Sequence, residues 1–104
     1  MEELTLFKKT GGRFVDSLYL SIDYFRKGED HYGLDSFLDS MYDLERLLEL
    51  QKCFRKLKIN SKIEEVIQKL YLYMKNKDIV GMTDELEFIL YPLAKELVEE
   101  SGMK

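Results

Sequence analysis

The sequence predicts an all-α protein, an antiparallel up-down-up-down four-helix bundle made of two related αα-hairpins. Apolar residues recur at steps of three and four along most of the chain, which is helical spacing. The chain also repeats itself, because residues 15–42 align without a gap on residues 63–90 and the apolar positions agree. One such hairpin cannot bury its apolar stripe alone. We therefore expect a single domain over residues 1–104, with hairpins at about 13–57 and about 61–100.

The first helix has an inward stripe that ends shortly before Gly28. Its members are Phe14, Val15, Leu18, Ile22 and Phe25. Upstream, Gly11 and Gly12 weaken the helix, since each glycine costs about 1 kcal/mol relative to alanine in a helix interior. Residues 3–9 are therefore expected to form a separate or frayed helical turn.

The two interhelical turns carry corresponding residues at an offset of 48. The pairs are Gly28 and Asn76, Asp30 and Asp78, and Gly33 and Gly81. The first pair can adopt the left-handed conformation that ends a helix. The carboxylates of the second pair can cap the free N–H groups of the next helix. The glycines of the third pair predict a close approach at each turn.

The remaining helices follow from their stripes and their end signals. The second helix is expected to reach Leu57, and a capping box formed by Ser61 and Glu64 is expected to start the third. Pro92 predicts a kink or a short break near residues 88–92, because proline lacks the N–H that bonds to the carbonyl of Phe88. The fourth stripe comprises Ile79, Met82, Leu86, Ile89, Leu90, Leu93 and Leu97.

Composition and charge exclude several functional classes. No apolar run approaches the roughly 18 residues that a membrane span needs, so no membrane partner is expected. The net charge of −4 argues against nucleic-acid binding, which depends on neutralising phosphates. The only cysteine, Cys53, cannot form an internal disulfide, which favours a cytoplasmic location.

Catalytic and cofactor motifs are missing from the sequence, which therefore indicates neither an enzyme nor a cofactor. The only histidine, His31, lies in a turn, and no Glu-x-x-His pair, phosphate loop or Cys-x-x-Cys pair occurs. A rival interpretation is a small divalent-metal-binding protein that uses His31 together with Asp35, Asp39 and Asp43. A solvated acidic face accounts for the same carboxylates.

A second rival rests on the uneven distribution of charge. Residues 52–77 hold 8 basic and 2 acidic side chains, whereas both flanking blocks are acidic. The strip could bind an anion, as in a lipid- or nucleic-acid-associated protein, or it could be a solvated face beside acidic neighbours. Its members are Lys52, Arg55, Lys56, Lys58 and Lys62.

The aromatic residues favour binding of a protein partner. Seven tyrosines and six phenylalanines exceed what four inward stripes need, and these residue types are enriched at interfaces. We expect apolar surface on the third and fourth helices to bind another protein or a second copy, as a possible homodimer. The candidate partner-binding residues are Tyr71, Met74, Phe88, Tyr91 and Val98. Tyrosines at a bundle edge, with their hydroxyls in water, account for the same residues without a partner.

The segment Leu70-Tyr71-Leu72-Tyr73-Met74, ahead of a short turn and an acidic last helix, resembles the Leu-Tyr-x-Tyr-Met segment of flagellin export chaperones. The resemblance covers about a third of the chain. That family's glycine-containing motif after an early Leu-Tyr is replaced here by Leu20-Ser21. The resemblance implies a small cytoplasmic helical bundle that holds a disordered segment of its client. An uncharacterised family of bacterial helical bundles fits the same residues.

Overall fold

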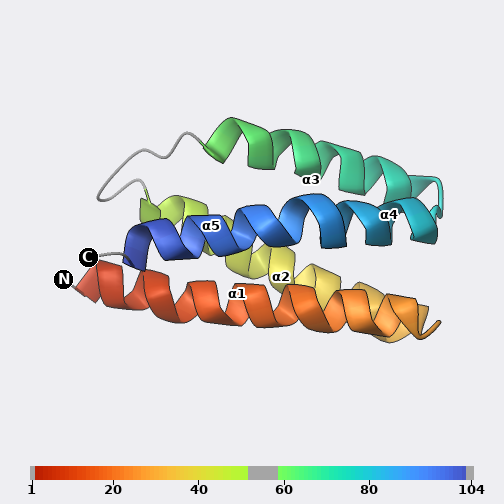
Figure 1. Ribbon diagram of the computed structural model, residues 1–104, viewed down its shortest axis with the longest axis horizontal. Coiled ribbons are helices and arrows are strands. Elements are labelled where there is room, and N and C mark those ends of the chain that lie inside the picture. The colour runs from red at the N-terminus through yellow and green to blue at the C-terminus, as the bar shows by residue number, and fades with distance from the viewer. Residues whose placement is uncertain (1, 52–58, 103–104) are drawn as a thin grey trace.

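The computed structural model describes residues 2–51 and 59–102 (Figure 1). Every one of these residues is helical except for turns at 27–29 and 76–78, and no strand occurs among them. The all-α prediction, with four helices, is confirmed. The elements are α1 (Glu2–Arg26), α2 (Asp30–Gln51), α3 (Ile59–Lys75), and a last helix that consists of α4 (Ile79–Glu85), the π-helical η1 (Leu86–Leu90) and α5 (Tyr91–Gly102). Within these ranges, no helix combines the length and the apolar character needed to cross a membrane.

The first helix is longer than expected. α1 continues through Gly11 and Gly12, so the prediction of a separate or frayed turn over residues 3–9 was wrong. Phe7 is fully buried ahead of the glycines, and its packing offsets their helix-breaking tendency. A Cβ atom on Gly11 would lie 2.7 Å from Cγ2 of Val98, so this glycine lets α5 approach α1 closely.

Both interhelical turns are built alike. The N–H of Glu29 donates to the carbonyl of Tyr24, and the N–H of Asp78 donates to the carbonyl of Tyr73, each at 2.9 Å. The N–H of Gly28 also donates to the carbonyl of Phe25, and the N–H of Lys77 donates to the carbonyl of Met74, each three residues earlier. The two pairs of bonds form Schellman motifs, which satisfy carbonyls at a helix end.

The turns correspond at an offset of 49, so the gapless offset of 48 is wrong there by one residue. Lys77 (φ 56°), rather than Asn76, takes the left-handed position of Gly28 (φ 81°). Asp78 caps α4 as expected, because its side chain accepts the N–H of Gly81. Asp30 is already the first residue of α2, and Glu29 stands where Asp78 stands in the other turn.

The glycines after the turns make room for aromatic rings, as the sequence predicts. A Cβ atom on Gly33 would lie 2.7 Å from the ring of Phe25, and one on Gly81 would lie 2.7 Å from the ring of Tyr73. The hydroxyl of Ser21 donates to the carbonyl of Gly33 at 2.8 Å. Each turn is therefore held against the end of the preceding helix.

The start of the third helix differs from the one that the sequence predicts. α3 begins at Ile59, ahead of Ser61, so the start predicted from the capping box was wrong. The first four N–H groups of a helix have no partner within the helix, and water can satisfy them. A helix can therefore begin before the residue that looks like its cap in the sequence. The predicted end of the second helix at Leu57, together with Cys53, lies outside the described residues.

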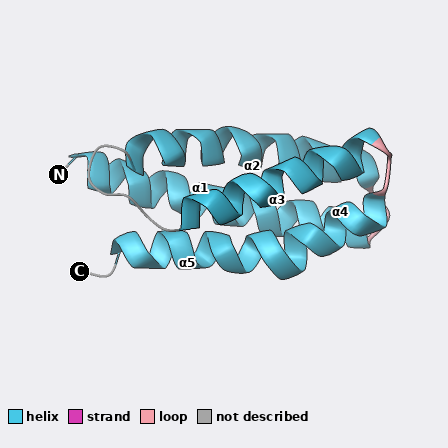
Figure 2. Ribbon diagram, turned by 90° about the horizontal axis from the view of Figure 1, so that it is seen from above, coloured by secondary structure: helices cyan, strands magenta, loops and turns pink. Residues whose placement is uncertain are grey.

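The buried core draws on all four helices. α1 packs along α2 and also along α5, whereas α3 packs on α4, η1 and α5. The backbones of α2 and α3 hardly approach each other, and Figure 2 shows all the helices lying along the long axis. The largest fully buried side chains are Phe7, Phe14, Leu18, Phe37, Leu44, Leu47, Ile63, Leu70, Met82, Leu86, Leu90 and Leu97.

Candidate functional site

A groove of about 320 Å³ lies between α3 and the segment formed by η1 and α5. We call it the α3–α5 groove. Its lining combines an apolar surface with charged side chains from both walls. The apolar residues are Val66, Phe88, Ile89, Pro92 and Leu93, and the charged residues are Lys62, Glu65, Lys69, Glu85 and Glu96.

The π-helical segment η1 creates one wall of this groove. The N–H of Tyr91 donates to the carbonyl of Leu86, five residues earlier, as in a π-helix. The sequence predicts a kink or a short break near residues 88–92, whereas the structure has a π turn at Leu86–Leu90 within a continuous helix. Proline has no N–H for an α-helical bond, so the wider turn accommodates it at low cost.

The π turn also shifts the inward stripe by one residue. The sequence predicts Ile89 or Leu90 and then Leu93 on the inward face, but Leu90 and Ala94 are the fully buried residues. Ile89 is 44% exposed instead, and Leu93 lies half-buried in the groove lining. Local irregularity of this kind is frequent at functional sites.

Phe88 is the most exposed apolar side chain of the groove. It is 62% exposed, beside Ile89 and against the apolar lining from α3. Complete burial of a phenylalanine side chain contributes roughly 1.5–3 kcal/mol, so a partner that covers it gains a substantial part of an anchor contact.

Glu85 is the one acidic side chain of the groove lining that is buried, with 9% of its surface exposed. The carboxylate of Glu85 makes no hydrogen bond or ion pair with any other described residue. Lys62 and Lys69 line the same groove but are exposed, and neither ammonium lies within ion-pair distance of Glu85. Three glutamates face two lysines, so the lining carries one net negative charge.

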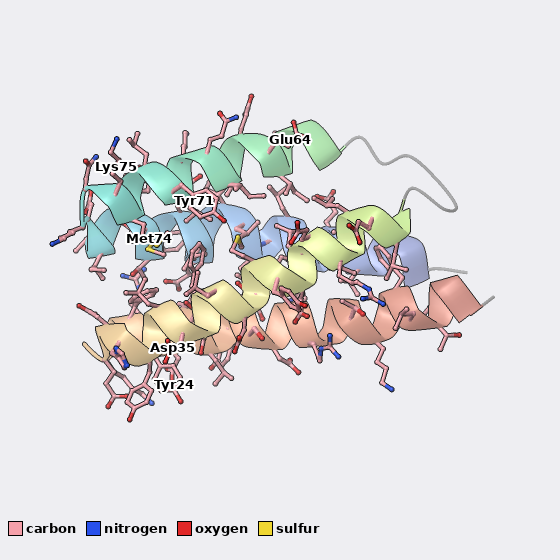
Figure 3. The ribbon with its side chains drawn as sticks, turned by 180° about the vertical axis from the view of Figure 1, so that it is seen from behind. Tyr24, Asp35, Glu64, Tyr71, Met74 and Lys75 are labelled. Atoms are coloured by element: carbon pink, nitrogen blue, oxygen red, sulfur yellow. The ribbon has the colours of Figure 1, made fainter. Side chains whose placement is uncertain are left out.

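A second groove, of about 350 Å³, lies between α2 and α3, and we call it the α2–α3 groove. Tyr71 lines it and packs edge-on against Phe37, with ring centroids 6.5 Å apart. Figure 3 shows Tyr71 and Met74 on the side of α3 that faces α2. The lining comprises Leu38, Met41, Tyr42, Leu44, Glu45, Leu48, Ile67 and Tyr71.

The other candidate residues lie between α1 and α5. The Tyr91 ring is 6.4 Å from the ring of Tyr19, and Nζ of Lys95 lies 5.6 Å from its centroid. Val98 packs against Gly11. The five residues predicted from the sequence therefore do not form one surface, and only Phe88 lies in the α3–α5 groove.

The acidic residues of α2 are not brought together either. Asp43 is buried and pairs with Arg13 of α1 at 3.0 Å, so it is not part of a solvated strip. Asp39 is exposed, and His31 and Asp35 are exposed with 4.0 Å between Nε2 and Oδ2. Among the described residues, no three histidine, cysteine, aspartate or glutamate side chains are grouped closely enough to hold a metal ion.

Only one residue of the basic strip, Lys62, lies within the part of the chain that the structure describes. Lys52, Arg55, Lys56 and Lys58 lie outside the described residues, and Lys62 is exposed at the α3–α5 groove.

An exposed ion-pair cluster connects the two hairpins near the turns. Nη2 of Arg26 lies 2.6 Å from Oε1 of Glu87 and 3.0 Å from Oδ1 of Asp84. The hydrogen bond with Glu87 has the largest effect on Arg26 and raises its pKa. The hydrogen bond with Asp84 raises that pKa further. At the end of α1, the hydrogen bond between Asp23 and Lys27 of the following turn raises the pKa of Lys27. The cluster links α1 to the last helix at the surface.

No protein-family model, curated protein or solved structure matches this chain at a significant level. The resemblance to flagellin export chaperones therefore stays a hypothesis from the sequence.

Proposed function

We propose that this chain is a non-enzymatic, cytoplasmic protein-interaction module. In this proposal, an antiparallel up-down-up-down four-helix bundle binds a segment of another protein in its α3–α5 groove. The observation that carries the proposal is the exposure of Phe88 and Ile89, 62% and 44%, beside an apolar groove. Singly scattered exposed apolar residues need no explanation, whereas a contiguous apolar surface rimmed by polar residues supports an interaction site.

The shape of the groove suits an elongated occupant. Two helical walls leave a channel between them, and an amphipathic helix commonly binds in such a channel through anchors spaced at three and four residues. Pro92 and Val66 contribute apolar surface, while lysines and glutamates from both walls supply the polar rim. Phe88 is the expected anchor contact, since a few large side chains account for most binding energy.

The charge of the groove favours another protein over a second copy. A two-fold dimer buries the same surface on both subunits. Such a dimer would therefore oppose two linings that each carry one net negative charge. A heterologous segment can carry the complementary charge instead.

Site-specific photo-crosslinking tests the proposal. A benzophenone amino acid replaces Phe88 in one variant and Val80 in a matched control, and each variant is irradiated in cells of the source organism. Val80 is 69% exposed on α4 and lines neither the α3–α5 nor the α2–α3 groove. We expect a discrete adduct with another protein at position 88 and none at position 80.

Three results would contradict the proposal. Equal labelling at both positions would indicate non-specific contact, and an adduct with the mass of two copies would indicate self-association. The absence of any adduct at position 88 would show that the groove is not occupied.

A further inference from the structure

Glu85 has an environment that is unusual for a glutamate. It is nine-tenths buried and lines an apolar groove, yet it has no hydrogen bond or ion pair with any other described residue. A buried carboxylate without a partner is strongly disfavoured, and such groups are normally paired in folded proteins. Thr83, a buried polar neighbour on the same helix, donates to the carbonyl of Ile79 at 2.7 Å.

The charged groups around the groove do not supply the missing partner. Lys62 and Lys69, both from α3, are exposed, and Glu65 and Glu96 are additional acidic groups near them. An exposed ammonium group is strongly hydrated on a flexible stem, so drawing it toward Glu85 costs both solvation and rotamer freedom. The carboxyl group of Glu85 therefore has no partner among the described residues, and it lines a groove with apolar residues beside it.

We infer that the segment bound in the α3–α5 groove carries a lysine or an arginine, flanked by apolar residues, whose charged group pairs with Glu85. This inference rests on the proposed function and names the chemistry of the partner. The apolar flanks would cover Phe88, Ile89 and Leu93, and the cation would supply the bond that Glu85 lacks. A charge-assisted hydrogen bond in a poorly solvated groove is stronger than one between neutral groups.

Selection from a phage-displayed library of random peptides against the full chain tests the inference. We expect the enriched peptides to share one lysine or arginine next to apolar residues. A representative synthetic peptide should bind the wild-type protein about tenfold more tightly than Glu85→Gln, a difference of about 1.4 kcal/mol. Fluorescence polarisation measures both affinities, and circular dichroism verifies that each variant is folded.

Glu96→Gln is the matched control, because Glu96 lines the same groove but is exposed. Its affinity should stay within about twofold of the wild type, as expected for a charge at the rim of an interface. Replacing the basic residue of the peptide by methionine tests the same contact without altering the protein. That peptide should lose the preference for the wild type and bind Glu85→Gln at least as tightly, because it covers the carboxylate without pairing it.

The inference and the proposed function fail in different ways. Enriched peptides that contain no basic residue, or equal effects of Glu85→Gln and Glu96→Gln, would overturn the inference. The proposed function would survive that result if Phe88→Ala still weakened peptide binding. A library that enriches no peptide, or binding unaffected by Phe88→Ala, would contradict the proposed function and the inference together.

Discussion

Gly11 and Gly12 are neighbours in α1, but only Gly11 lies against another helix. A Cβ atom on Gly11 would lie 2.7 Å from Val98, whereas one on Gly12 would have no atom within 4 Å. Gly12→Ala should therefore stabilise the protein by up to about 1 kcal/mol, the helix-propensity gain alone. Gly11→Ala should destabilise it, because the stiff valine side chain cannot move aside without altering the approach of α5.

Thermal or urea unfolding followed by circular dichroism measures both effects. The double variant Gly11→Ala, Val98→Ala provides the control, since a smaller residue at 98 relieves the overlap and should recover part of the lost stability. Equal stabilisation by the two single alanine variants would show that α1 and α5 are not closely packed at this point.

For single residues, the sequence predicts which side chains lie off the inward stripe of a helix better than it predicts which neighbouring helix covers them. Phe88 was found from its position off the inward stripe, and it lies at a groove. Glu85 was missed, because one glutamate in an acidic helix carries no local signal that it is buried. Asp43 was placed on a solvated face, although it is buried against Arg13, thirty residues away in sequence. Both cases depend on which helix packs alongside, which no local pattern encodes.

At the scale of elements, apolar periodicity predicts that the four helices exist, and end signals predict their boundaries less well. The sequence predicts a left-handed residue at Gly28 and at Asn76, and the structure has it at Gly28 and, one residue later than expected, at Lys77. A gapless alignment hides this insertion, because matching apolar residues within helices do not report on the turn between them.

The sequence predicts a kink or a short break near Pro92. It does not predict that a π turn changes which residues of the last helix are buried. A kink leaves the helical register unchanged, whereas a π turn advances it by one residue. This shift exchanges Leu93 for Ala94 on the buried face and moves Ile89 toward solvent. The groove surface is therefore a product of the π turn and was not evident from the periodicity.

Pro92→Ala tests whether the π turn depends on proline or on packing. Leu86, Leu90, Ala94 and Leu97 are fully buried and hold the register on both sides of Pro92. We expect η1 to persist and peptide binding to stay within about twofold, because those packing contacts remain unchanged. Stability should rise by about 1 kcal/mol, less than the roughly 3 kcal/mol that proline costs in a regular helix.

Chemical denaturation measures the stability change, and fluorescence polarisation measures binding. Loss of peptide binding in a variant that remains folded would show that proline itself shapes the groove.

At the scale of the whole molecule, the packing is unequal. α1 contacts α2 and every part of the last helix, whereas α2 and α3 hardly approach each other and leave the α2–α3 groove between them. Arg26 adds surface ion pairs between the hairpins, and pairs of this kind contribute little to stability in water. The contacts of α1 with the last helix therefore hold the two hairpins together.

The sequence predicts that four helices share one core, because two of them alone cannot bury their apolar stripes. It could not predict which pairs of helices would leave grooves. Tyr71 and Phe88 both lie off the inward stripes, yet they line different grooves, one between α3 and α2 and the other between α3 and the last helix. Their separation follows from the order in which the helices pack, and that order is set by contacts between segments far apart in the chain.

Methyl chemical-shift mapping decides whether a partner segment binds in the α3–α5 groove, because it observes methyl groups of both grooves at once. The protein, labelled at isoleucine, leucine and valine methyl groups, is titrated with a peptide enriched by the library selection. We predict that the methyl signals of Val66, Ile89 and Leu93 shift, while those of Leu38 and Ile67 in the α2–α3 groove remain in place. Shifts confined to Leu38 and Ile67, or no shifts at a saturating peptide concentration, would contradict the assignment of the α3–α5 groove as the binding site.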